Sequence, residues 1–265
     1  MKIGSCLLLL ATPDDPLAIE SIPLVAASGY DYAEVSLARM YDLSGQEVDH
    51  YCAAFERNNL PVEVFNNAIP RSVPLVGPDV SQDKWMAYIE KALSLARRMG
   101  AHLITMSGPN KRRVPETFTW EEGFPQYAAF LRLFAEEAAA SGITLAIEPI
   151  NDEESGFIAT VSEARRAMEA AGCDNIGVIV DIYHFCKQRD SMDDLLALVR
   201  AGKLVHIHHA VPGGRTYPQE RDFEESKWLL LPLVNAGYAG RISVEAYADV
   251  PDRQLPVASR LLHTL

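Results

Sequence analysis

The chain has 265 residues, 48% of them hydrophobic, a formal net charge of −12 and a sequence pI near 5.0. An acidic surface repels nucleic-acid backbones and anionic membranes, so we expect neither as a partner. The four cysteines are scattered, with no CxxC pair, which is typical of reduced thiols in a cytoplasmic protein. The apolar run that follows Lys2 is too short to span a bilayer and predicts a first buried strand instead.

Apolar runs of strand length alternate along the chain with longer segments of helical period. The predicted strands cover residues 3–10, 32–37, 61–67, 101–108, 143–150, 176–185, 203–210 and 241–247. Two of the clearest helical segments cover 83–100 and 126–142. Eight strand–helix units over this length predict the α/β class and a (β/α)8 TIM barrel, as a single domain over residues 1–265.

The main alternative is a doubly wound open sheet. Such a sheet usually has fewer units and carries a glycine fingerprint after its first strand, whereas ATPDDP (11–16) stands there in this chain. The longest irregular segment, 66–82, follows the third predicted strand. A loop of that length in a compact domain is often functional.

Acidic and imidazole side chains lie near the ends of four consecutive predicted strands. They are Glu148, Asp181, the pair His206 and His208, and Glu245. The ends of barrel strands carry the active site in this fold, and a lone carboxylate inside an apolar run is costly unless it is paired, protonated or bound to a cation. Convergence of the four positions on one divalent ion accounts for all of them together.

Strand alternation separates the three histidines of KLVHIHHA (203–210). His206 and His208 share one face and His209 points to the other. If the shared face is the barrel interior, His208 lies nearer the mouth and is the predicted ligand. His206 is then a deeper or supporting residue, and His209 faces the helices. The simpler alternative is that all three are structural histidines.

Four motifs resemble the xylose isomerase-like barrel family. They are AIEPIN (146–151), VDIYHF (180–185), HIHHAVPGGRTYP (206–218) and GRISVEAY (240–247). More narrowly they are similar to sugar and sugar-phosphate isomerases and epimerases, including ketose 3-epimerases of the tagatose/psicose type. The pattern departs from those enzymes after His208, where AVPGGR (210–215) is closer to the hydroxypyruvate isomerase branch.

The resemblance implies roles for particular residues. It implies one divalent metal ion, held by Glu148, Asp181, His208 and Glu245, with Glu148 and Glu245 also as the catalytic acid/base pair. It implies substrate binding by Glu154, His184 and Arg215. The oxygen-rich ligand set suits manganese or magnesium, and leaves zinc, cobalt and iron open.

The expected reaction is proton transfer next to a carbonyl of a small sugar, through an enediolate stabilised by the metal ion. Because a ligating imidazole must be neutral, metal affinity is expected to fall below about pH 6.5. An inosose-type dehydratase or a hydroxypyruvate-type isomerase remains an alternative on the same scaffold. An endonuclease would need a basic face, and a non-catalytic sugar-binding protein would need no metal cage. A homodimer or homotetramer is left open.

Two further charged features remain. Glu34 is an acid within an apolar strand, which either closes the pocket floor or pairs with a buried base. The basic run KRR (111–113) is either a solvated loop or a contact for an anionic substrate.

Overall fold

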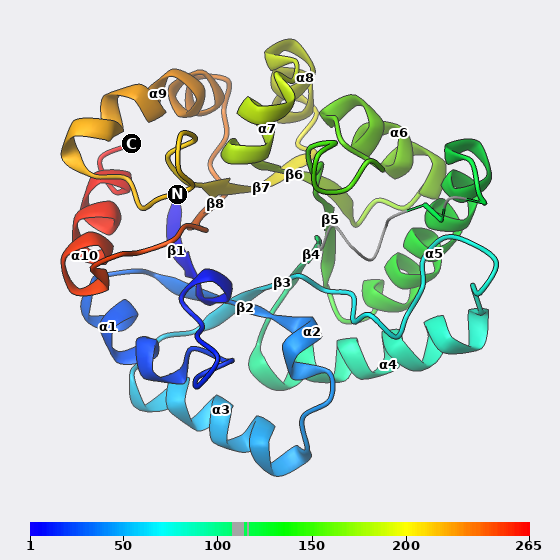
Figure 1. Cartoon of the computed structure of the whole chain (residues 1–265), viewed down its shortest axis with the longest axis horizontal. Helices are drawn as coiled ribbons and strands as arrows, with labels where there is room; N and C mark the ends of the chain where they lie inside the picture. The colour runs from blue at the N-terminus through cyan, green and yellow to red at the C-terminus, as the bar shows by residue number, and fades with distance from the viewer. Residues whose placement is uncertain (108–113, 116) are drawn as a thin grey trace.

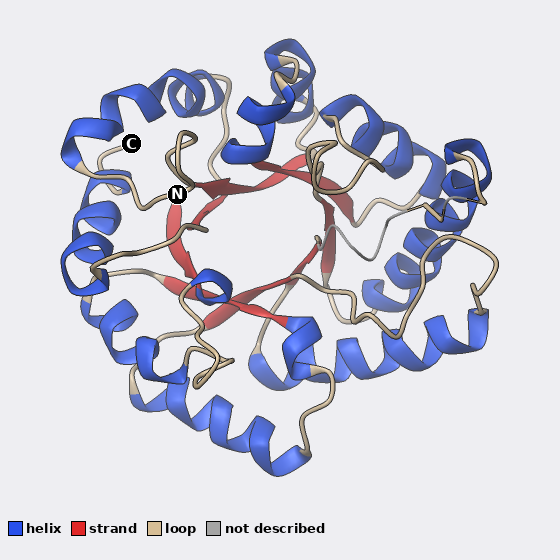
Figure 2. Ribbon diagram, viewed as in Figure 1, coloured by secondary structure: helices blue, strands red, loops and turns tan. Residues whose placement is uncertain are grey.

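A computed structural model describes residues 1–107, 114, 115 and 117–265, with the backbone alone at residues 225 and 226. Its strands form a closed, all-parallel barrel in the order β1 to β8, and the helices surround the strands (Figures 1 and 2). The predicted (β/α)8 barrel is therefore confirmed. The basic run 111–113 lies outside the described residues.

The strands are β1 (Lys2–Cys6), β2 (Tyr32–Ser36), β3 (Val62–Asn66), β4 (Leu103–Met106), β5 (Thr144–Ile147), β6 (Ile176–Asp181), β7 (Leu204–His209) and β8 (Arg241–Val244). The described helices are α1 (Ile22–Ala27), α2 (Leu37–Met40), α3 (Gly45–Arg57), α4 (Gln82–Met99), α5 (Trp120–Ala139), α6 (Val161–Ala171), α7 (Ile182–Gln188), α8 (Met192–Arg200), α9 (Glu220–Asn235) and α10 (Pro251–Leu262). Short 3₁₀ turns cover Leu7–Leu9 and Ile19–Ser21. No helix in the described part of the chain is long and apolar enough to cross a membrane.

The strand predicted over 176–185 is shorter in the structure, because residues 182–185 belong to α7. The strand stops at Asp181, whose carboxylate accepts hydrogen bonds from the backbone N–H groups of Tyr183 (2.7 Å) and His184 (3.4 Å) and so caps α7. An aspartate in this position satisfies backbone donors that a helix start leaves free. His184 therefore lies in the first turn of a helix rather than at a strand end.

The helix predicted over 126–142 begins earlier, at Trp120. Thr119 and Glu122 form a capping box, in which the Thr119 hydroxyl accepts from the Glu122 N–H and the Glu122 carboxylate accepts from the Thr119 N–H. This reciprocal pair defines the helix start. The predicted loop over 66–82 is confirmed, since it joins β3 to α4.

Two apolar cores lie on the two sides of the barrel wall. The larger core packs the helices against the outer faces of the strands, whereas the smaller core fills the barrel with Tyr32, Val64, Leu103, Ala146 and Ile179. The Tyr32 ring lies against Gly4, where an added Cβ would come within 2.2 Å of the ring. The barrel is thus filled with side chains below its C-terminal mouth, and polar groups gather above this layer.

Candidate active site

Four polar side chains meet at the C-terminal ends of β5 to β8. Glu148 and Glu245 directly follow β5 and β8, Asp181 ends β6, and His208 lies in β7. Each side chain offers a ligand atom that lies within 4.8 Å of the others, and all four residues are buried. The structure therefore brings together the four residues that the sequence predicts as metal ligands, in an arrangement that could hold a metal ion.

His208 presents its two ring nitrogens to different partners. Nε2 lies 2.7 Å from Oε1 of Glu34 and donates to it, because a carboxylate oxygen can only accept. Nδ1 lies 3.3 Å from Glu245 Oε2 and 3.6 Å from Glu148 Oε1, and in the described part of the chain neither approach has the geometry of a hydrogen bond. Burial alone would lower the pKa of His208, but the charges of Glu34 and Glu245 raise it well above its usual value.

Both carboxylate oxygens of Asp181 accept hydrogen bonds. Oδ1 caps α7, and Oδ2 accepts a hydrogen bond from Arg215 Nη2 at 3.0 Å. Burial raises the pKa of Asp181 to about 6, helped by the charges of Glu245 and Glu148 and opposed by His184 and Arg215. Further positive charge beside this carboxyl group would favour its charged form and lower the pKa again.

Glu245 contacts Arg215 and two residues that the sequence motifs did not single out, Asn66 and Cys6. Asn66 Nδ2 donates to Glu245 Oε1 at 3.3 Å, and the Cys6 thiol lies 3.7 Å from the same oxygen. Arg215 Nη2 lies 2.5 Å from Oε2. Burial alone would raise the pKa of Glu245, but His208 and Arg215 hold it well below its usual value. Cys6 and Asn66 end β1 and β3, so the rule that strand ends carry the site could have found them.

Arg215 reaches the cluster from the loop after β7. Its backbone has a φ of 50°, its carbonyl accepts from the Tyr247 N–H at 2.8 Å, and its guanidinium lies 5.0 Å from the centre of the Tyr183 ring. A non-glycine residue in this left-handed region is uncommon and is held there by its surroundings. The arginine predicted as a substrate contact therefore lies directly beside the carboxylates Asp181 and Glu245.

Glu154 and His184 are joined by Asn151, which the sequence analysis missed. Asn151 Nδ2 donates to Glu154 Oε1 at 3.1 Å and lies 2.6 Å from His184 Nδ1. Since a carboxylate only accepts, the amide nitrogen must face Glu154, so His184 Nδ1 accepts and Nε2 carries the proton. His184 Nε2 lies 3.9 Å from Asp181 Oδ2. The two predicted substrate-binding residues therefore lie beside the cluster and share one buried amide.

The other histidines of β7 divide as strand alternation predicts. His206 lies on the face of His208, with Nε2 2.9 Å from Glu34 Oε2. Glu34 thus pairs with buried bases, which was one of its two predicted roles. His209 is fully buried, and neither of its ring nitrogens has a hydrogen-bond partner among the described residues. Burial lowers the pKa of His209 to about 4, which keeps this ring neutral.

A model of the xylose isomerase-like TIM barrel family matches residues 22–262. The chain belongs to this family. The resemblance inferred from the four motifs is therefore confirmed, and the match covers all of the residues that the resemblance implicates.

Two proteins with detectable sequence similarity to this chain are named as epimerases. The chain is 26% identical over 208 residues to a probable ketose 3-epimerase of Synechocystis sp., which covers 76% of this chain and 69% of that protein. It is 28% identical over 198 residues to L-ribulose 3-epimerase of Mesorhizobium japonicum, which covers 71% of this chain and 64% of that protein.

Solved structures share the fold across the whole chain. A crystal structure of D-psicose 3-epimerase in the presence of D-fructose superposes with a TM-score of 0.79, at 19% identity, over 100% of this chain and 98% of the other. At that identity the likeness establishes the barrel architecture, and the chemistry has to be argued from the site itself.

Proposed function

We propose that the chain is a divalent-metal-dependent sugar isomerase or epimerase that moves a proton at the carbon next to a ketose carbonyl. The observation that carries this proposal is the buried cluster of Glu148, Asp181, His208 and Glu245, with ligand atoms within 4.8 Å of one another. The two relatives, named as a probable ketose 3-epimerase and an L-ribulose 3-epimerase, support a ketose as the substrate class.

The donor set fits a hard divalent cation. His208 Nδ1 is buried and faces two carboxylates, and in the neutral ring with its proton on Nε2 it directs a lone pair toward them, as a nitrogen ligand of a cation does. Three carboxylates with one imidazole suit Mn²⁺ or Mg²⁺, and Zn²⁺, Co²⁺ and Fe²⁺ also accept such ligands. A bound divalent cation would polarise the substrate carbonyl and so acidify the neighbouring carbon.

Glu148 and Glu245 are the proposed acid/base pair. They follow β5 and β8, and β6 and β7 separate these strands in the barrel, so the two carboxylates approach a bound sugar from different sides. One carboxylate takes the proton and the other returns one. Return to the opposite face of the same carbon gives epimerisation, whereas one carboxylate acting on two neighbouring carbons gives isomerisation.

Arg215, His184 and Glu154 are the proposed substrate contacts. Arg215 offers guanidinium donors at the mouth, and His184 offers its Nε2–H as long as Asn151 occupies Nδ1. Glu154 is nearly a third exposed and can accept a hydrogen bond from a sugar hydroxyl. These groups set the pose of the sugar and do not have to bind the metal.

The proposal is tested by metal analysis and by turnover. Protein purified without chelator should contain one divalent ion per chain, and single alanine variants of Glu148, Asp181, His208 and Glu245 should lose it. A panel of ketoses should be epimerised or isomerised, with activity removed by a chelator and restored by Mn²⁺. Alanine variants that keep full metal content and activity would contradict the site, and turnover of an inosose in place of any ketose would contradict the reaction class.

A further inference from the structure

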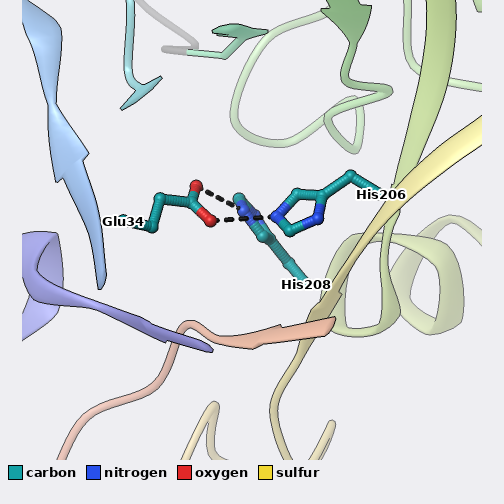
Figure 3. Close-up of side chains that lie close together, drawn as sticks. All are labelled: Glu34, His206 and His208. Carbon is teal, nitrogen blue, oxygen red and sulfur yellow. Dashed lines mark hydrogen bonds and ion pairs between the residues drawn. The ribbon is translucent and has the colours of Figure 1, made fainter. Parts of the chain in front are cut away.

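A buried carboxylate lies inside the barrel beneath the proposed metal ligands. Glu34 extends from β2 across the interior to His206 and His208 of β7 (Figure 3). Its Oε1 lies 2.7 Å from Nε2 of His208, and its Oε2 lies 2.9 Å from Nε2 of His206. None of the three side chains is more than 1% exposed, so each of these contacts is shielded from water.

This contact determines which nitrogen of His208 faces the carboxylate cluster. Both oxygens of Glu34 accept, so the proton of the His208 ring is held on Nε2. In the neutral ring, which is the form that can bind a metal ion, Nδ1 is then left with a lone pair directed toward Glu148 and Glu245. With the proton on Nδ1 instead, the ring would present an N–H to the site and could not act as a ligand.

The second oxygen of Glu34 keeps the carboxylate itself in place. His206 Nε2 donates to Oε2, so the carboxylate is fixed at both oxygens and cannot rotate away from His208. The two imidazole rings also contact each other, edge to face, with centroids 5.0 Å apart. The orientation of the His208 ring is therefore fixed, on the side away from the carboxylate cluster, by the hydrogen bond to Glu34 and the ring contact with His206.

We propose that Glu34 is a positioning residue of the metal site, which fixes the ring orientation and the tautomer of His208, with His206 as the anchor of its second oxygen. The inference rests on the proposed function. A carboxylate behind a metal-bound histidine typically contributes a factor of roughly 10 to 100 in metal affinity. In this role Glu34 acts through His208 and does not itself contact the substrate or the metal ion.

The barrel offers a matched control at its other end. Glu63 of β3 is also a buried carboxylate, and it pairs with Lys2 and with Arg241 Nε at 2.6 Å. Glu63→Gln removes a buried charge and its ion pairs, as Glu34→Gln does, but Lys2 and Arg241 do not belong to the proposed metal site. A general loss of stability should therefore affect both variants, whereas a loss of positioning should affect Glu34→Gln alone.

The experiment is a direct Mn²⁺ titration of the full chain, followed by electron paramagnetic resonance of the free ion. Glu34→Gln should keep one site per chain and bind Mn²⁺ at least about tenfold more weakly than the unsubstituted protein. Glu34→Leu, which removes both acceptors, should bind at least as weakly, and Glu34→Asp should recover part of the affinity. Glu63→Gln should bind Mn²⁺ as the unsubstituted protein does. Far-UV circular dichroism and thermal melting report whether each variant is folded.

Three results would overturn the inference. Unchanged Mn²⁺ affinity in folded Glu34→Gln and Glu34→Leu would reduce Glu34 to a packing residue. A second equivalent of Mn²⁺ in the unsubstituted protein that disappears in Glu34→Gln would make Glu34 a ligand. If the unsubstituted protein binds no Mn²⁺ or other divalent ion, the proposed function fails and this inference fails with it, whereas unchanged variants beside a metal-binding parent affect only the inference.

Discussion

The two ends of the barrel interior hold buried carboxylates in opposite electrostatic situations. At the N-terminal end, Glu63 has two cationic partners, Lys2 and Arg241. At the C-terminal end, Glu148, Asp181 and Glu245 converge on one another, and Arg215 pairs with two of them. The carboxylate at the first end is paired with cations of the chain itself, whereas the second end gathers three carboxylates around one imidazole.

This difference in pairing gives the buried carboxylates at the two ends different expected roles. The negative charge of a buried carboxylate that pairs with cationic side chains is already compensated, so it needs no bound metal ion. A cluster of carboxylates around an imidazole nitrogen is an arrangement that could hold a divalent cation. The pKa values follow the same division, because burial raises that of Asp181 to about 6, whereas for Glu63 the hydrogen bonds of Lys2 and Arg241 outweigh burial and lower it.

The substitution expected to change activity most is His208→Ala, and the neighbouring His209→Ala is its comparison. His208→Ala should abolish metal binding and lower kcat/KM by at least about 10³-fold, because it removes the nitrogen ligand. His209→Ala removes a ring that points to the other side of the strand, and should cost mainly stability. Metal analysis, steady-state kinetics and thermal melting of both variants test this. An inactive His209→Ala beside an active His208→Ala would reverse the assignment.

The second effect is the pH dependence of metal affinity. The pKa of His208 in the metal-free protein is raised above 6.5, and the metal ion binds only the form without that proton on Nδ1. Affinity should therefore decrease as pH falls through this raised pKa, by about tenfold per pH unit for each proton displaced. The decrease should begin above pH 6.5, higher than an unperturbed histidine predicts. Calorimetric titration with Mn²⁺ in buffers of different ionisation enthalpy measures the protons released, and a pH-independent affinity would contradict it.

The third effect tests the amide that joins Glu154 to His184. Asn151→Ala should lower kcat/KM about tenfold, the equivalent of roughly one hydrogen bond, while the metal content stays at that of the parent. Asn175→Ala is the matched control, because Asn175 also donates to two groups, the carbonyls of Ala135 and Ile143, away from the site. The control should lose stability and keep kcat/KM. Loss of metal from Asn151→Ala would place Asn151 among the groups that hold the cation.

The smallest effect concerns the neutralised end of the barrel. The pKa of Glu63 is lowered in the folded protein, so its ion pairs stabilise the fold above the unfolded-state value near 4.5 and lose this contribution as pH falls through the lower folded-state value. Glu63→Gln should reduce the free energy of unfolding by about 1 kcal/mol at pH 7, since Lys2 is half-exposed and the pair is partly screened. Urea unfolding at pH 7 and at pH 3 tests this, because the difference should shrink at the lower pH. An equal difference at both values would mean that packing rather than charge is responsible.

The amino-acid sequence alone is enough to predict the barrel and the acidic and imidazole residues at its strand ends. Barrel strands are buried on both faces, so they appear in the sequence as continuous apolar runs of strand length. An acidic residue within such a run is costly to bury and therefore indicates a functional or paired position. That logic selected Glu148, Asp181, His208 and Glu245 before any contact was known. The resemblance of the surrounding motifs added Glu154, His184 and Arg215, which the structure also places beside the cluster.

Which atoms face one another depends on the folded arrangement of the strands. Cys6, Asn66 and Asn151 are ordinary in the sequence, because their importance comes from partners 239, 179 and 33 residues away along the chain. The choice between His208 Nδ1 and Nε2 likewise depends on Glu34, which is 174 residues away. Periodicity assigns a side chain to a face of a strand, but a hydrogen bond needs a distance and an angle between two elements, and these exist only once the barrel has closed.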